Sequence, residues 1–148
     1  VIQATVTKLA DDLKANGILA ITSSGRSAQK MSRYRPRTPI FTFTHKKKVL
    51  NSLTAIWGVE PIGTIKEAQA SKMFKMMLKE LEKIGRLKKD GLYVATVGYP
   101  VGMPGSTNTI KILTPSEMEY YLNFKSSKDK EAKEKKEPKA KKLDKKSK

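Results

Sequence analysis

Hydroxyl, glycine and arginine residues gather in one short segment, Thr22 to Ser27, which reads TSSGRS. It follows an apolar run, Ile18 to Ile21, and precedes helix-forming residues that end before Pro36. A loop between a strand and a helix brings backbone N–H groups and the positive end of the helix dipole to one point. Side-chain hydroxyls and a guanidinium group can join them there. The pattern predicts a phosphate site made by Thr22, Ser23, Ser24, Gly25, Arg26 and Ser27.

Catalytic and metal-binding chemistry has little support elsewhere in the sequence. TSSGRS lacks the glycine-lysine-serine or glycine-lysine-threonine ending of a Walker loop, which argues against ATP binding of that kind. His45 is the only histidine and is followed by three lysines, so it is interpreted as a solvated loop residue. Trp57 is interpreted as a packing residue. No carboxylate pair or metal-ligand cluster has suitable spacing, so we expect a binding site without a catalytic centre.

A second loop, rich in glycine and proline, is expected to share the phosphate site. It runs from Tyr99 to Thr107, after a predicted strand over residues 91–98. Ligands of α/β sheets bind beyond the carboxyl ends of the strands, and both loops leave that edge if their strands are parallel. The residues expected to form a flap over the ligand are Pro100, Gly102, Pro104, Gly105 and Ser106.

The spacing of apolar residues indicates helices that alternate with strands. The expected helices span residues 1–16, 27–34, 46–53, 66–84 and 117–124. The expected strands span residues 18–22, 39–44, 54–57, 91–98 and 108–113, with a turn over 60–63. This order predicts a three-layer α/β/α sandwich with a five-stranded, mostly parallel sheet. The short connection between the last two strands predicts one antiparallel edge strand, which could pair with another subunit.

One ordinary domain over residues 1–122 accounts for most of the 148 residues. The absence of cysteine excludes disulfides and thiolate metal sites and favours an intracellular, cytoplasmic location. No apolar run approaches the roughly 20 residues that a membrane span needs. The first residue is Val1 rather than methionine, which favours a piece of a longer chain.

A lysine-rich tail is predicted over residues 123–148. It holds twelve lysines and five acidic residues, so it carries +7 of the chain's net +17 and leaves +10 for the rest. Leu143 is the only large apolar residue after Phe124, so the tail is expected to be disordered. It could tether nucleic acid or an acidic surface, but the acids and the lack of interleaved aromatic residues favour a solubilising role.

Three ordered motifs resemble the C-terminal domain of pyruvate kinases. They are TSSGRSAQKMSRYRPRTP at Thr22–Pro39 with the following IFTFT, WGVEP at Trp57–Pro61, and GYPVGMPGSTNTIKI at Gly98–Ile112. The resemblance runs from Val1 to about Leu113. It implies a three-layer domain that binds allosteric effectors and assembles tetramers, while a separate barrel domain performs the glycolytic phosphoryl transfer.

By this resemblance, Thr22–Ser27 holds an effector phosphate and Pro100–Ser106 closes over the sugar. Members tuned to a sugar bisphosphate often carry a lysine where this chain has Ser23. They also use a tryptophan and an arginine in the region that matches Ile65–Lys75, where this chain has no tryptophan. A nucleoside or sugar monophosphate is therefore at least as good an expectation.

The family's catalytic lysine and its magnesium and potassium ligands belong to the barrel domain, so the resemblance implies those cofactors only for a full-length enzyme. This chain alone is expected to be inactive on phosphoenolpyruvate and ADP. Three alternatives stay open at this point. They are a stand-alone domain that binds a phosphorylated metabolite, a nucleic-acid-binding protein that acts through its tail, and a small enzyme whose base or nucleophile the sequence does not reveal.

Overall fold

Five strands form the centre of the domain, and the computed structural model describes residues 1–66, 69–98 and 107–125. The strands are β1 (Gly17–Ile21), β2 (Ile40–Thr44), β3 (Val59–Thr64), β4 (Tyr93–Gly98) and β5 (Thr107–Leu113). The helices are α1 (Ile2–Asp12), α2 (Arg26–Arg33), α3 (Lys47–Ser52), α4 (Ala70–Lys83) and α5 (Pro115–Leu122), with a short 3₁₀ helix, η1, at Leu53–Ala55.

The strands pair in the order β3-β2-β1-β4-β5. β1 is parallel to both β2 and β4, and β2 is parallel to β3. β5 runs antiparallel to β4 at one edge of the sheet. This confirms the predicted α/β fold with a mostly parallel sheet and one antiparallel edge strand.

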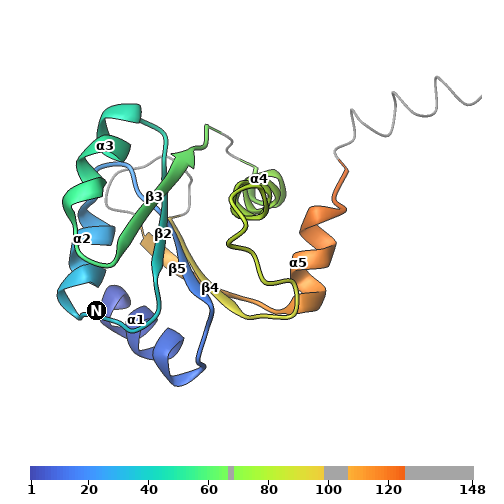
Figure 1. The fold of residues 1–148 in the computed structure, drawn as a ribbon, viewed down its shortest axis with the longest axis horizontal. Coiled ribbons are helices and arrows are strands. Elements are labelled where there is room, and N and C mark those ends of the chain that lie inside the picture. Colours follow the sequence, from blue (N-terminus) through green and yellow to red (C-terminus); the bar gives the residue numbers. More distant parts are fainter. Residues whose placement is uncertain (67–68, 99–106, 126–148) are drawn as a thin grey trace, which may run out of the picture.

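Helices cover both faces of the sheet, as Figure 1 shows. Successive side chains of a strand point to opposite faces, so Ile18 and Ala20 of β1 pack with residues of α1 and α2. Leu19 and Ile21 of the same strand pack with residues of α4 and α5. Every residue of β1 is buried, which explains why this strand reads as a continuous apolar run.

The predicted positions of the third strand and the turn after it are wrong. Residues 53–55 form η1, the chain turns at Gly58 with φ of +71°, and β3 follows over the residues that the sequence predicted to be a turn. Pro61 lies inside β3, where it has no N–H to donate. β3 tolerates it because it is an edge strand, and its register with β2 shifts next to that position.

Other boundaries differ by a few residues from those that the sequence predicts. α1 ends at Asp12, α4 begins at Ala70 and α5 begins at Pro115. The predicted tail lies outside the described residues beyond Lys125. No described helix is long and apolar enough to cross a membrane.

Candidate functional site

The loop between β1 and α2 folds back on its own first residue. Thr22 follows the buried strand β1 and is itself buried. Its Oγ1 accepts a hydrogen bond from the backbone N–H of Gly25 at 2.8 Å. This bond closes Thr22–Gly25 into a tight turn and fixes where α2 begins.

Gly25 precedes the first turn of α2 with φ of +88°, a left-handed conformation that glycine adopts without strain. A glycine has no side chain to cap a helix, and no side-chain cap bond is made at this helix start. The first turn of α2 also contains no acidic residue. The positive end of the helix therefore has no carboxylate of its own to compete with a bound anion, and the N–H of Arg26 makes only a long hydrogen bond, at 3.5 Å, to Oγ of Ser24.

Two polar side chains of the predicted site are exposed beside this helix start. They belong to Ser24, whose Oγ lies 3.5 Å from the backbone nitrogen of Arg26, and to Arg26 itself. Among the described residues, Arg26 forms no ion pair with a carboxylate. Ser23 is partly buried. A guanidinium group and a hydroxyl are thus free to bind a ligand at the start of α2.

Ser27 connects the loop to β5, the antiparallel edge strand of the sheet. Its Oγ lies 3.1 Å from Oγ1 of Thr107, the first residue of β5. Thr107 pairs with Gly98, the last residue of β4. Because β4 is parallel to β1, Gly98 leaves the sheet at the same edge as Thr22.

The predicted flap lies outside the described residues. Pro100, Gly102, Pro104, Gly105 and Ser106 all fall between Gly98 and Thr107, in the segment 99–106. The two described ends of this segment lie at the phosphate-loop edge. The condition that the sequence prediction required, a β4 strand parallel to β1, is met.

His45 also lies at this edge, in the bend directly after β2, so it is a loop residue as predicted but is less solvated than expected. The residue is partly buried, and its Nδ1 lies 2.6 Å from the carbonyl oxygen of Ile65, to which Nδ1–H donates. Its Nε2 is buried and has no hydrogen-bond partner among the described residues. The signal in the sequence was its place directly after a buried strand. The exposed Lys46, Lys47 and Lys48 add positive charge next to it.

The sequence analysis interpreted Trp57 as a packing residue, and this interpretation is wrong. Half of its surface is exposed. The guanidinium carbon of Arg35 lies 5.0 Å from the centre of its ring, which is a cation–π distance. Trp57 lies before β3 and Arg35 after α2, so both occupy the edge of the sheet opposite to the phosphate loop.

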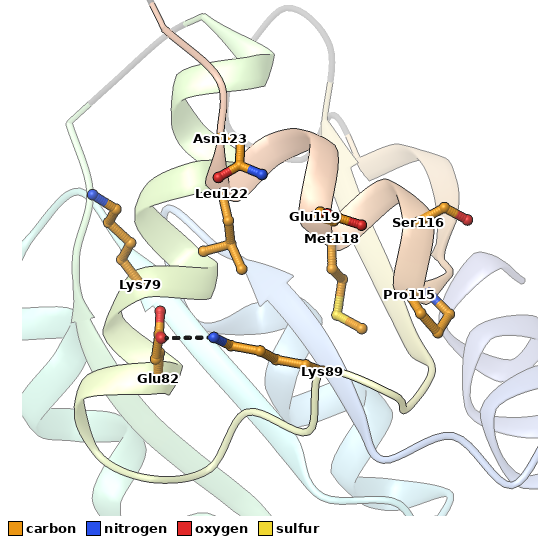
Figure 2. A pocket seen from close by; sticks show the side chains of 9 residues that line it. All are labelled: Lys79, Glu82, Lys89, Pro115, Ser116, Met118, Glu119, Leu122 and Asn123. Atoms are coloured by element: carbon orange, nitrogen blue, oxygen red, sulfur yellow. Dashed lines mark ion pairs between the residues drawn. The ribbon is translucent and has the colours of Figure 1, made fainter.

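A cleft of about 660 Å³ lies between α4 and α5, in the other helix layer (Figure 2). Its wall includes two lysines and two glutamates, and Glu82 pairs with Lys89 at 3.2 Å. These opposite charges balance, so the cleft does not favour an anion. Among the described residues, no group of three or more histidine, aspartate or glutamate side chains could hold a metal ion.

Residues 1–113 match the family described as "Pyruvate kinase, alpha/beta domain". The pyruvate kinase of Lactobacillus delbrueckii subsp. bulgaricus is 34% identical over 108 residues, which cover 73% of this chain and 18% of that protein. The Clostridium acetobutylicum pyruvate kinase is 32% identical over 103 residues, or 70% of this chain and 22% of that protein. Pyruvate kinase 2 of Synechocystis sp. is 32% identical over 111 residues, or 75% and 19%.

The matched part of the chain therefore spans about a fifth of the length of these curated relatives. The family match includes all five strands and ends at the last residue of β5. Helix α5 and the lysine-rich residues that follow it lie beyond the match.

Proposed function

Since this chain belongs to the pyruvate kinase alpha/beta domain family, we propose that it binds the phosphate group of a small-molecule effector at the loop Thr22–Ser27. One observation carries the proposal. α2 begins without a side-chain cap and without an acidic residue, at the carboxyl edge of the sheet and beside the exposed guanidinium of Arg26. Such a helix start is suited to an anion.

Arg26 supplies the charge that holds the phosphate, and it can present two N–H groups to two phosphate oxygens. Ser24 donates a hydroxyl hydrogen bond from the same side of the loop. Thr22 is buried, and its hydroxyl oxygen accepts the N–H of Gly25. Its role is to hold the loop in the binding conformation.

The effector we propose carries a single phosphate, such as a nucleoside or sugar monophosphate. Ser23 brings no charge to the loop, and Arg26 is the only cation within Thr22–Ser27. The region Ile65–Lys75 contains no tryptophan to cover a second phosphorylated group. These residues provide for one strongly held anion.

In a complete enzyme, this domain would serve regulation and assembly. We propose that the enzyme transfers a phosphoryl group from phosphoenolpyruvate to ADP in glycolysis, in the cytoplasm. A catalytic domain outside this chain would use magnesium and potassium for that reaction. An effector held at Arg26 would stabilise one arrangement of a tetramer, to the extent that it binds this arrangement more tightly than the other.

Calorimetric titration tests the proposal with four ligands: AMP, ribose 5-phosphate, glucose 6-phosphate and fructose 1,6-bisphosphate. We expect at least one monophosphate to bind and Arg26→Ala to weaken it about 10- to 150-fold, since a hydrogen bond to a charged group contributes about 1.5–3 kcal/mol. Arg33→Ala is the matched control, because it removes the same charge from the other end of α2. Equal loss in both variants, or no binding of any of the four ligands, contradicts the proposal.

A further inference from the structure

A basic and aromatic surface lies at the edge of the sheet opposite to the phosphate loop, where α2 ends. We call it the RYRPR surface, and it consists of Lys30, Arg33, Tyr34, Arg35, Arg37 and Trp57. All six side chains are exposed. Tyr34 and Trp57 leave 57% and 50% of their surfaces open to solvent.

One hydrogen bond and one turn of the backbone place Trp57 and Arg35 next to each other on this surface. The hydroxyl of Ser32, in the last turn of α2, donates to the backbone carbonyl of Trp57 at 2.6 Å. Arg35 adopts a left-handed conformation with φ of +47° between α2 and the buried Pro36. With the backbone in this conformation, the guanidinium group of Arg35 lies over the indole ring of Trp57. The result is a pair of a guanidinium group and an indole ring, with both side chains exposed to solvent.

The positive charge of the RYRPR surface is not neutralised within the domain. In residues 1–66, 69–98 and 107–125, none of its four basic side chains forms an ion pair. Asp11 is the acid in contact with this segment, but its carboxylate accepts the backbone N–H groups of Arg37 and Thr38 and the hydroxyl of Thr38. A groove of about 390 Å³ runs beside the surface, lined in part by Lys30, Arg33 and Tyr34.

We propose that the RYRPR surface binds single-stranded nucleic acid. Bases stack on Tyr34 and on the Arg35–Trp57 pair, and phosphates contact the surrounding basic side chains. Exposed aromatic faces interleaved with arginine and lysine are what a single strand requires, because its bases are free to stack and its backbone is anionic. An acidic peptide would use the same cations but would leave both aromatic rings without a function, so we favour the nucleic acid.

This activity does not depend on the proposed phosphate site, because the two surfaces lie at opposite edges of the sheet. The lysine-rich residues beyond Phe124 contain no aromatic side chain and can supply only charge. The RYRPR surface supplies the stacking faces that this segment lacks. A strand bound to the folded domain could therefore gain affinity from both.

Trp57 provides a direct measurement, because it is the only tryptophan in the chain. Its fluorescence is followed while the full chain is titrated with a short oligothymidylate. We expect quenching that saturates, with an affinity that falls steeply as salt is added, because phosphate contacts release counterions. A duplex of equal length should quench less, since its bases are already stacked. Oligoglutamate that binds as tightly as the single strand, or oligothymidylate that binds without quenching, overturns the proposal.

Variants separate stacking from charge, with affinity measured by the anisotropy of a labelled oligothymidylate. We expect Trp57→Ala to weaken binding about 5- to 150-fold, the range found for a lost base–aromatic stack. Arg35→Lys keeps the charge but loses the planar group, so it should weaken binding less than Arg35→Ala does. Lys79→Ala is the matched control, because it removes one exposed charge from α4, in the opposite helix layer.

Equal effects of Lys79→Ala and Arg35→Ala would mean that overall charge drives binding, and the proposal would then be wrong. If deletion of residues 126–148 removes all binding, the charge of these residues and not the RYRPR surface drives binding, and the proposal is again wrong. Arg26→Ala should weaken oligothymidylate binding no more than Lys79→Ala does, so this activity and the effector site can fail independently. Trp57→Phe, which keeps an aromatic ring, should bind more tightly than Trp57→Ala.

Discussion

Gly25 determines the geometry of the phosphate loop at the residue scale. Its φ of +88° suits glycine, and an added Cβ would lie 3.2 Å from Cδ2 of Leu53. We expect Gly25→Ala to lower the free energy of unfolding by about 1–2 kcal/mol, the usual cost of a left-handed conformation for a residue with a Cβ. Urea unfolding measures it. Gly63→Ala is the control, because no atom lies within 4 Å of its added Cβ and its φ is not in the left-handed region. Equal stability of both variants would contradict this account.

Tyr93 links the stability of the domain to alkaline pH. Burial raises the pKa of its phenol above 10.0, while the contact with Lys88 and the charge of Arg86 oppose this shift. The hydroxyl donates to the carbonyl of Arg86 and accepts the N–H of Lys88, both at 3.0 Å. We expect Tyr93→Phe to cost about 1–3 kcal/mol at neutral pH, because both backbone groups lose their partner.

The pH dependence of this difference has a definite sign. Above pH 10 the unfolded chain loses the phenol proton while the folded chain retains it, so the unfolded state binds fewer protons. The free energy of unfolding should therefore fall more steeply above pH 10 in the original chain than in Tyr93→Phe. Chemical denaturation from pH 8 to 11 measures both slopes, and parallel slopes would exclude Tyr93 as the cause.

Some residues of the candidate site could be predicted from the sequence, and others could not. Thr22 to Ser27 stand between an apolar run and a helix, and the structure has a strand, a loop and a helix at those positions. The environments of His45 and Trp57 depend on Ile65 and Arg35, which lie about twenty residues away in the sequence. The residues next to His45 and Trp57 in the sequence do not indicate contacts with residues that far away.

At the scale of elements, α5 extends the domain beyond the family match. Thr114 caps the helix by accepting the N–H of Glu117 at 3.4 Å, and Pro115 occupies its first turn. The ring of Tyr121 lies 5.1 Å from that of Phe74 on α4. Lys111 of β5 pairs with Glu117 at 2.9 Å. The helix is thus joined to both neighbouring elements.

Met118 is the side chain of α5 that enters the core, where it is 1% exposed. We expect Met118→Ala to lower the free energy of unfolding by about 2–5 kcal/mol, through lost burial and the cavity that remains. Met76→Ala on α4 makes the same chemical change at a side chain that is 41% exposed, so its effect should stay below about 0.5 kcal/mol. Thermal unfolding followed by circular dichroism compares them. Similar melting temperatures would show that α5 adds little to the core.

The sequence also predicted most elements and misplaced one. Strong periodicity made α4 evident, and the buried strands read as apolar runs. The third strand was misplaced because the apolar residues before Gly58 outweighed a segment that contains Pro61. Only the position of β3 at the edge of the sheet makes that proline acceptable, and an edge position is a property of the assembled sheet.

At the scale of the whole molecule, the matched part of the chain spans about a fifth of the length of each of these pyruvate kinases. We expect the purified chain to show no pyruvate formation from phosphoenolpyruvate and ADP with magnesium and potassium present. Phosphoryl transfer needs a positioned lysine and metal ions, and in the described part of the chain no group of three or more histidine, aspartate or glutamate side chains could hold a metal ion. A coupled assay with a complete pyruvate kinase as positive control measures it. Turnover above the buffer control would refute the expectation.

Helix α2 has its start at the phosphate loop and its end at the RYRPR surface. Its eight residues make it about 12 Å long, which is the distance between the two proposed sites along the helix axis. If both proposals hold and the effector changes the affinity for the single strand, the single strand must change the affinity for the effector by the same factor.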